Sequence, residues 1–152
     1  MSTFVIAEIG INHNGDMKIV KRTIDVVYTK EDLDRPRESP WGTTNREQKM
    51  GLEFNRKQYD EIDRYCKEKG IEWFASAWDV ESQIFLRQYD LKYNKVASAL
   101  LTHRRLLEMI AEEGKYTFIS TGMSTLEQIE KAVQVFKDVD CPFELMHCNS
   151  SY

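Results

Sequence analysis

Residues 116–152, YTFISTGMSTLEQIEKAVQVFKDVDCPFELMHCNSSY, decide how the rest of the chain is organised. A short apolar run at 118–119 stops at small polar residues and a glycine, and a second run at 143–146 ends in another polar segment. Between the two runs, Ser124 and Glu127 have the spacing of a capping box, and apolar residues follow at helical spacing. The stretch therefore predicts a strand, a helix and a second strand. Parallel sheets built from such βαβ units bind ligands at the carboxyl ends of their strands.

The same alternation of helix and strand runs from residue 55 to the end of the chain. The expected elements are a helix capped by Asn55 and stopped by Gly70, a strand at 71–75, a helix at 80–89, a strand at 93–96, and a helix capped by Thr102 and ended by Gly114. On the first of these helices Tyr59, Ile62, Tyr65 and Cys66 are predicted to face inward. This order favours a parallel α/β fold, either a barrel or a doubly wound sheet.

The first 48 residues are less regular. The continuous apolar run at 4–7 predicts a buried parallel strand. Asp16 is a suitable cap for a helix that begins at Met17, but residues 23–29 are rich in β-branched side chains and fit a strand equally well. The polar stretch 29–48 holds Pro36 and Pro40 and shows little periodicity, so it is interpreted as a long functional loop.

The composition places the chain in a broad class. A length of 152 residues is about one domain, and a net charge of −4 argues against non-specific nucleic-acid binding. No apolar run approaches the roughly 20 residues of a membrane span, and the N-terminus lacks the pattern of a signal peptide. Three cysteines without metal-ligand spacing fit reduced thiols in a cytoplasmic protein, with Cys66 expected in the core.

Polar side chains gather where the predicted strands end. A single lysine among small hydroxyls suits a phosphate or carboxylate ligand, because the lysine supplies charge and the hydroxyls supply oriented donors. Lys95 is either this lysine or a rim residue that reaches water, and Glu8 is either a site acid or a salt-bridged structural acid. Two histidines alone make no metal site. The expected face holds Glu8, Asn12, His13, Ser76, Lys95, Ser98, Ser120, Thr121, His147, Asn149, Ser150 and Tyr152.

Several motifs, taken in order, closely resemble sialic acid synthases, the N-acetylneuraminate synthase group of phosphoenolpyruvate-condensing enzymes. They are IAEIGINHNGD, WGTTNREQKMGLEF, FASAWD, YNKVASALLTH, ISTGMSTLEQIEKA and ELMHCNSSY. The resemblance implies a catalytic (β/α)8 barrel, followed in the family by a small antifreeze-like domain. It also implies that phosphoenolpyruvate condenses with open-chain N-acetylmannosamine and releases phosphate, with a divalent metal (manganese or magnesium) polarising the aldehyde.

The resemblance also assigns roles to individual residues. It implies that Lys95, Ser98, Ser120 and Ser150 bind phosphoenolpyruvate, that Glu8, Ser150 and Tyr152 border the sugar, and that Glu8 is the catalytic candidate for proton handling. Some members have a threonine where Ala77 stands. The implied partners are these two small molecules and a second copy of the chain in a homodimer, which family members form through the C-terminal antifreeze-like domain. From the composition we expect no nucleic-acid partner and no membrane.

Two departures from the family pattern shape the expectation for this chain. Between Val20 and Thr23 the family has the rest of its first helix and a second strand with a phosphoenolpyruvate-binding lysine, for which Lys21 is an ambiguous substitute. The sequence also stops at Tyr152, before the strands that carry the metal-binding histidines, and His147 does not align with them. We therefore expect residues 1–152 to form a partial (β/α)8 barrel, without the antifreeze-like domain and without metal ligands of its own.

These departures leave three functional hypotheses. The chain is a sialic acid synthase by lineage with little activity alone, a non-catalytic remnant that binds phosphate or phosphoenolpyruvate, or a synthase for a related nine-carbon sugar acid.

Overall fold

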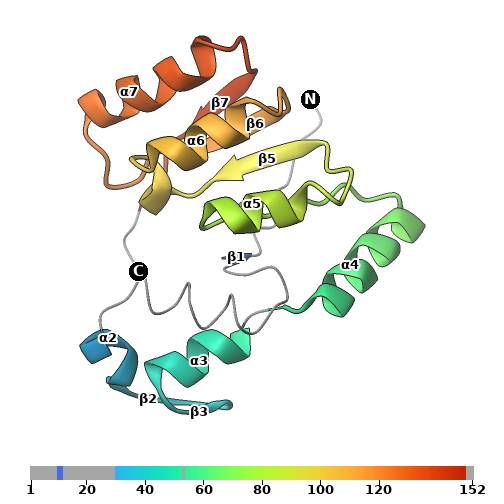
Figure 1. The fold of residues 1–152 in the computed structure, drawn as a ribbon, viewed down its shortest axis with the longest axis vertical. Coiled ribbons are helices and arrows are strands. Elements are labelled where there is room, and N and C mark those ends of the chain that lie inside the picture. Colours follow the sequence, from blue (N-terminus) through green and yellow to red (C-terminus); the bar gives the residue numbers. More distant parts are fainter. Residues whose placement is uncertain (1–9, 12–29, 53, 150–152) are drawn as a thin grey trace. The chain divides into compact units, whose positions relative to one another are not determined.

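The computed structural model describes residues 10–11, 30–52 and 54–149 (Figure 1). The predicted strand at 4–7 and the ambiguous segment 16–29 lie outside the described residues. The chain divides into two compact units, 1–10 with 72–152 and 11–71, and each is described by itself.

The larger unit is built on a parallel sheet. In the part of the chain that the structure describes, five strands lie side by side in chain order: β1 (Gly10–Ile11), β4 (Ser76–Ala77), β5 (Tyr93–Val96), β6 (Tyr116–Ser120) and β7 (Phe143–Met146). The pairs β4–β5, β5–β6 and β6–β7 are all parallel. This confirms the predicted α/β class and the two strands expected on either side of the last helix.

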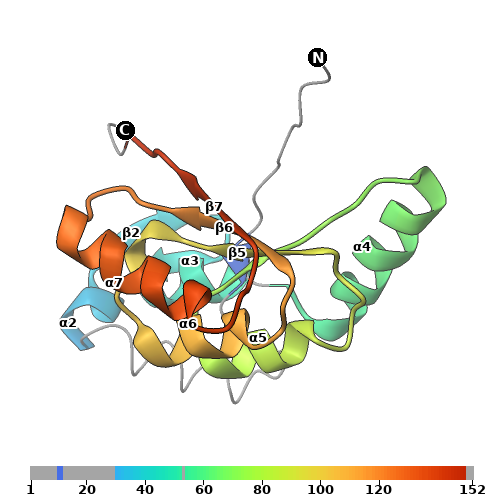
Figure 2. The same ribbon diagram turned by 90° about the horizontal axis from the view of Figure 1, so that it is seen from above.

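Helices cover one face of this sheet (Figure 2). They are α5 (Val80–Leu86), α6 (Arg104–Ala111) and α7 (Leu126–Lys137), and a 3-10 turn at Ser98–Leu100 follows β5. Leu106 and Ile110 on α6 are fully buried. Phe136 on α7 packs against Phe143 on β7, with ring centroids 5.7 Å apart. Burial of such apolar side chains is the main stabilising contribution to this layer.

The stretch 29–48 is not the long loop that its polarity predicted. It contains α2 (Lys30–Asp34), an antiparallel hairpin of β2 (Pro36–Ser39) and β3 (Gly42–Thr44), and the start of α3 (Asn45–Leu52). The Glu47 carboxylate accepts hydrogen bonds from the Thr43 and Thr44 amides at 2.9 and 3.0 Å. Local polar contacts of this kind stabilise the segment. They do not require regularly spaced hydrophobic residues, so the sequence shows no periodic pattern here.

The helix predicted between Asn55 and Gly70 is confirmed as α4 (Arg56–Lys69). Asn55 forms a full capping box with Gln58, and Gly70 ends the helix in the left-handed conformation at φ 65°. Tyr59 is buried as expected, but Tyr65 is 54% exposed, so its inward assignment was wrong. Cys66 is only half-buried, not a core residue.

Two other helix caps lie one residue later than predicted. Thr125, not Ser124, caps α7 and forms its box with Gln128, because Met123 adopts a left-handed φ of 59° before the helix begins. His103, not Thr102, caps α6 by accepting a hydrogen bond from the Leu106 amide at Nδ1. At both helix starts, two adjacent polar residues could serve as the cap. The backbone conformation of the turn before each helix determines which of the two does so.

The strand predicted at 71–75 was also misplaced. The ladder begins at Ser76, whose Cα lies opposite that of Lys95. Phe74 is buried because its ring stacks on Phe118, with centroids 5.6 Å apart. The apolar side chain of Phe74 therefore indicates packing in the core and not pairing in a strand. The helix predicted at 80–89 ends earlier, at Leu86.

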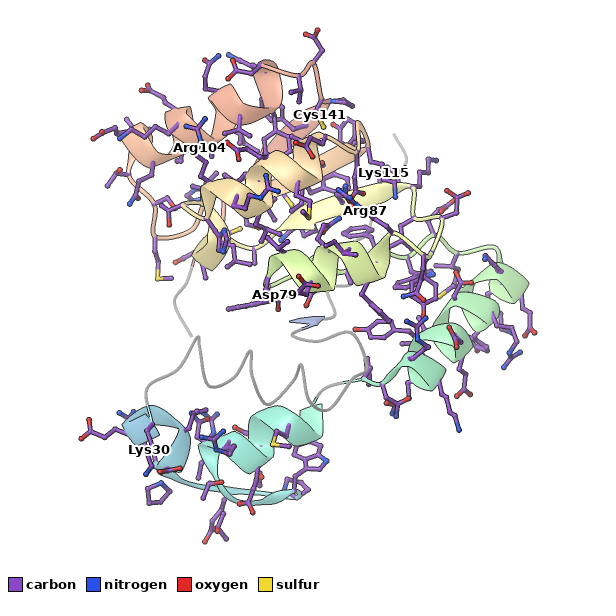
Figure 3. All side chains as sticks on the ribbon, in the orientation of Figure 1. Lys30, Asp79, Arg87, Arg104, Lys115 and Cys141 are labelled. Carbon is purple, nitrogen blue, oxygen red and sulfur yellow. The ribbon has the colours of Figure 1, made fainter. Side chains whose placement is uncertain are left out.

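A polar network lies on the helix-covered side of the sheet, where α5, β5 and the end of α6 meet. The Glu113 carboxylate, with a side chain 8% exposed, accepts hydrogen bonds from Arg87 at 2.8 Å, Gln83 at 2.8 Å and Asn94 at 3.1 Å. The Lys115 ammonium lies 3.5 Å from the same carboxylate. Arg87 and Lys115 are labelled in Figure 3. These contacts connect α5 and β5 to the segment that follows α6.

This network predicts a loss of stability in acid. Burial by itself would raise the pKa of Glu113, but the hydrogen bonds from Arg87, Gln83 and Asn94 and the charge of Lys115 outweigh it and lower the pKa. A carboxyl with a depressed pKa stabilises the fold above its unfolded value, about 4.3, and loses that contribution as the pH falls through its folded value. We expect urea midpoints to be flat from pH 7 to 5 and to fall below pH 4, and the fall to be smaller in Glu113→Gln. An equal fall in both proteins would exclude Glu113 as its source.

Candidate active site

The register of the parallel strands brings the predicted hydroxyl and lysine side chains to one face of the sheet. Lys95 lies opposite Phe118, and Ser120 lies opposite Met146. Because side chains alternate along a strand, Lys95, Phe118 and Ser120 all belong to the face that the helices do not cover. Lys95 and Ser120 lie toward the carboxyl ends of their strands, as the sequence predicted.

Lys95 is a buried lysine, with 3% of its surface exposed. Ser76, its neighbour on β4, is 1% exposed. This burial disagrees with the alternative of a rim lysine that reaches water along its stem. A buried ammonium is costly unless anionic or polar groups compensate it, so the position favours a residue that meets a negative charge.

The ends of β5, β6 and β7 are held together by hydrogen bonds. The Met146 carbonyl accepts hydrogen bonds from both the amide and the hydroxyl of Thr121, each at 3.0 Å. The Ser98 hydroxyl oxygen accepts a hydrogen bond from the Gly122 amide at 3.0 Å. These contacts fix the backbone around Ser98 and Ser120, so their hydroxyls are presented at defined positions.

Cys148 lies among these residues, two positions after the end of β7. Its thiol donates to the Met146 carbonyl at 3.5 Å. A hydrogen bond from the Ser120 hydroxyl lowers the pKa of Cys148, and Ser98, the Thr121 amide and the Lys95 charge lower it further against the opposing effect of burial. The groups that stabilise a thiolate here are those that would stabilise a bound anion. The polar run after Met146 was the signal that marked this residue.

The three cysteines are therefore expected to differ in reactivity. Burial raises the pKa of Cys141, and burial and the nearby Asp63 raise that of Cys66. Because the thiolate is the nucleophile, iodoacetamide at pH 7 should alkylate Cys148 several-fold faster than either of the others. Mass spectrometry of the digested protein measures the three rates together. Faster labelling of Cys66 would contradict the described environment of Cys148.

The structure thus brings together Lys95, Ser98, Ser120 and Thr121, and adds Cys148. Asn149 and His147, at the end of the described chain, are exposed. Five predicted positions lie outside the described residues: Glu8, Asn12, His13, Ser150 and Tyr152. Their predicted roles are not tested by the structure.

A divalent metal needs a set of converging ligands. Within residues 10–11, 30–52 and 54–149, no three His, Cys, Asp or Glu side chains are grouped as such a set. The described residues therefore do not fit a metal centre by themselves. In the same ranges no helix has the length and apolar character to cross a membrane.

With this geometry established, comparison with known proteins gives the family. The pattern of the NeuB family matches residues 10–152. The chain belongs to the NeuB family. It is 32% identical to N-acetylneuraminate-9-phosphate synthase of Homo sapiens, over 98% of this chain and 47% of that protein. It is 28% identical to N,N'-diacetyllegionaminic acid synthase of Campylobacter jejuni, over 99% of this chain and 52% of that protein.

A solved structure supports the same assignment. The N-acetylneuraminic acid synthetase of Leptospira borgpetersenii, determined with citrate, superposes with a TM-score of 0.69 at 31% identity, covering 97% of this chain and 54% of that chain. The fold of this NeuB-family chain is therefore a partial (β/α)8 barrel, as predicted. The chain spans about half the length of the curated relatives it matches.

The alignment with the human relative extends over 169 positions, more than the 152 residues of this chain. It therefore contains gaps on this chain's side.

Proposed function

We propose that this chain carries the phosphoenolpyruvate site of a nine-carbon sugar acid synthase of the N-acetylneuraminate type. The observation that supports this most strongly is the buried Lys95 beside Ser98, Ser120 and Cys148 at the carboxyl ends of adjacent parallel strands. Phosphoenolpyruvate carries a phosphate and a carboxylate, so a single buried ammonium with neighbouring hydroxyl donors matches its chemistry.

In this proposal each described residue has a binding role. The Lys95 ammonium compensates the charge of the phosphate or carboxylate, and the hydroxyls of Ser98 and Ser120 donate hydrogen bonds that fix the ligand's orientation. The methylene carbon of phosphoenolpyruvate then forms a bond to the aldehyde carbon of N-acetylmannosamine, water adds to the resulting cation, and phosphate leaves. Glu8 is the proposed group for proton handling, with Ser150 and Tyr152 beside the sugar.

A bound manganese or magnesium ion would supply polarisation of the aldehyde. The described residues do not form its site, so no step of this scheme is assigned to it. For that reason we propose that the 152 residues alone turn over slowly or not at all, although they hold phosphoenolpyruvate.

The proposal includes two candidates for the acceptor sugar. N-acetylmannosamine follows from the resemblance to sialic acid synthases, whereas the similarity to a diacetyllegionaminic acid synthase favours a related acceptor as the second candidate. Both acceptors react through an aldehyde, so the role of Lys95 and the two serines is the same in each case.

Phosphate release from phosphoenolpyruvate, measured with manganese and with or without N-acetylmannosamine, tests the reaction. The chain alone is expected to release little phosphate. A version with a helix and strand restored after Val20, and with the remaining barrel strands of a relative added after Tyr152, should release phosphate only when a sugar acceptor is present. Sugar-dependent release by the 152 residues alone would contradict the proposed inactivity. Failure of a folded extended version with every acceptor would contradict the proposed reaction.

A further inference from the structure

Thr121 follows the last residue of β6 and holds the ends of β6 and β7 together. Its amide and its hydroxyl both donate to the Met146 carbonyl, each at 3.0 Å. The Cys148 thiol donates to the same carbonyl at 3.5 Å. Met146 is the last residue of β7, so three donors meet where this strand ends. The Thr121 hydroxyl thus adds a second bond to the one that its backbone forms with β7.

The backbone of Thr121 also begins the turn that follows β6. The Thr121 carbonyl accepts a hydrogen bond from the Ser124 amide at 3.3 Å, and Met123 within this turn has a left-handed φ of 59°. That conformation is uncommon for a residue with a side chain, and it persists where surrounding contacts determine it. Thr121 supplies such contacts, because its amide and hydroxyl bind β7 while its carbonyl binds the end of the turn.

This turn brings the Gly122 amide to Ser98. The amide donates to the Ser98 hydroxyl oxygen at 3.0 Å, and Gly122 is buried. A hydroxyl can accept at its oxygen and still donate its one hydrogen, so Ser98 keeps a hydrogen for another acceptor. In the structure Ser98 interacts in this way with Cys148. A phosphate or carboxylate oxygen is a stronger acceptor than a thiol sulfur, so the oriented hydroxyl suits an anionic ligand.

We propose that Thr121 is a positioning residue of the phosphoenolpyruvate site, which acts on the ligand through Gly122 and Ser98. The Thr121 hydroxyl is committed to the Met146 carbonyl, so its effect on the ligand is indirect. The inference rests on the proposed function, because it takes phosphoenolpyruvate as the ligand.

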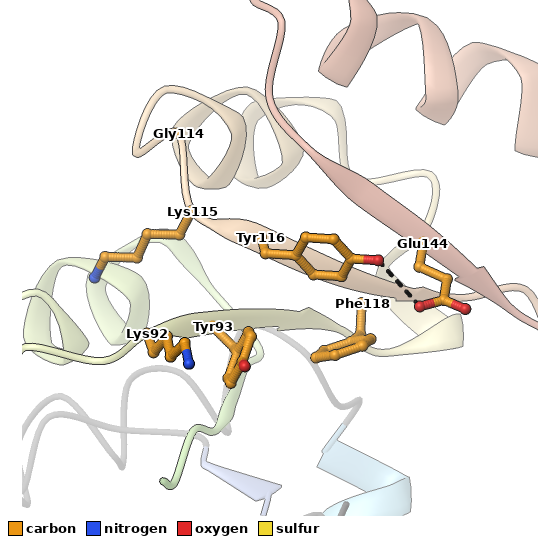
Figure 4. Close-up of a pocket in the computed structure, with 7 residues that line it drawn as sticks. All are labelled: Lys92, Tyr93, Gly114, Lys115, Tyr116, Phe118 and Glu144. Carbon is orange, nitrogen blue, oxygen red and sulfur yellow. Dashed lines mark hydrogen bonds between the residues drawn. The ribbon is translucent and has the colours of Figure 1, made fainter. Parts of the chain in front are cut away.

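Thr117 offers a matched control on the same strand. Its hydroxyl donates to the Lys115 carbonyl at 2.9 Å, and its side chain is fully buried. It lies toward the amino end of β6, the end at which Figure 4 labels Lys115 and Tyr116, and away from Ser98. Valine in place of either threonine keeps a β-branched shape and removes one hydroxyl. Both variants should therefore lose stability, whereas only Thr121→Val should lose affinity.

Titration calorimetry with phosphoenolpyruvate measures the affinity of each variant, and urea denaturation measures its stability. Thr121→Val should weaken binding about 5- to 10-fold, the effect of one net hydrogen bond. Thr121→Ser, which keeps the hydroxyl, and Thr117→Val should both stay within about twofold of the wild type. In a Ser98→Ala background, Thr121→Val should change the affinity by no more than about twofold, because the hydroxyl through which it acts is already absent.

The proposal would be overturned by equal affinities of the wild type and Thr121→Val, by an equal loss in Thr117→Val, or by an undiminished effect in the Ser98→Ala background. If Thr121→Val does not fold, Thr121→Ala takes its place in the same comparison. Failure of the positioning role alone leaves a wild-type chain that binds phosphoenolpyruvate and a Lys95→Met variant that binds it more weakly. A folded wild-type chain that binds no phosphoenolpyruvate would overturn both this role and the proposed function.

Discussion

Replacement of Lys95 by methionine should weaken phosphoenolpyruvate binding about 10- to 100-fold, since hydrogen bonds to charged groups contribute about 1.5–3 kcal/mol. Lys95 is 3% exposed, so its interaction with a ligand is little screened by water. Methionine retains much of the side-chain volume and removes the charge that would meet the ligand. The free energy of unfolding of the variant is measured beside its affinity, so that the loss of binding is compared between folded proteins.

Titration calorimetry of the wild-type chain and the variant measures this difference. Lys131→Met is the matched control, because Lys131 is an exposed lysine of α7 paired with Glu127 at 2.7 Å. Its affinity for phosphoenolpyruvate should equal that of the wild type. Ser98→Ala should have a smaller effect, several-fold, since one neutral donor is removed. Equal affinities of the wild type and Lys95→Met would show that Lys95 does not bind phosphoenolpyruvate.

Replacement of Glu113 by alanine should destabilise the chain by about 2–3 kcal/mol, near the lower end of the cost of breaking a buried ion pair. The carboxylate side chain is 8% exposed, whereas Arg87 is 39% exposed and keeps some contact with water, which limits the loss. The variant leaves Gln83 and Asn94, both buried, without a shared acceptor. Unsatisfied buried donors account for much of the expected cost.

Urea denaturation at pH 7 measures the change in the free energy of unfolding. Glu112→Ala is the control, because Glu112 is the exposed neighbour of Glu113 at the end of α6 and should change stability by less than about 0.5 kcal/mol. Glu113→Gln, which keeps an acceptor but loses the charge, should fall between the two. A Glu113→Ala variant as stable as the control would show that the network does not contribute to stability.

The sequence predicted those parts of the fold whose signals are local. Asn55 and Gly70 bound α4 because a capping side chain and a left-handed glycine are read from two or three neighbouring residues. The strands β5, β6 and β7 were found because each is a short run that ends in polar residues, and their alternation with helices implied parallel pairing. Lys95 and Ser120 followed directly from that arrangement.

The structural features that were not predicted from the sequence depend on tertiary contacts. Phe74 looked like a strand residue, but it is buried through its stacking on Phe118, 44 positions later in the chain. The hairpin of β2 and β3 is stabilised by Glu47, a polar residue that leaves no periodic pattern. Ser124 and Thr125 both satisfy the capping-box pattern, and the left-handed Met123 determines which of them caps α7. The environment of Cys148 is assembled from three strand ends.

The central claim is that phosphoenolpyruvate binds at the carboxyl ends of β5, β6 and β7. Amide chemical shifts of the isotope-labelled chain, recorded during titration with phosphoenolpyruvate, test it most directly. The account predicts that shifts concentrate at 95–98, 120–122 and 147–149, and that in Lys95→Met the same shifts need about 10- to 100-fold more phosphoenolpyruvate. Shifts concentrated around Tyr93 and Glu144 at the opposite end of the strands, or no shifts in a folded chain, would contradict it.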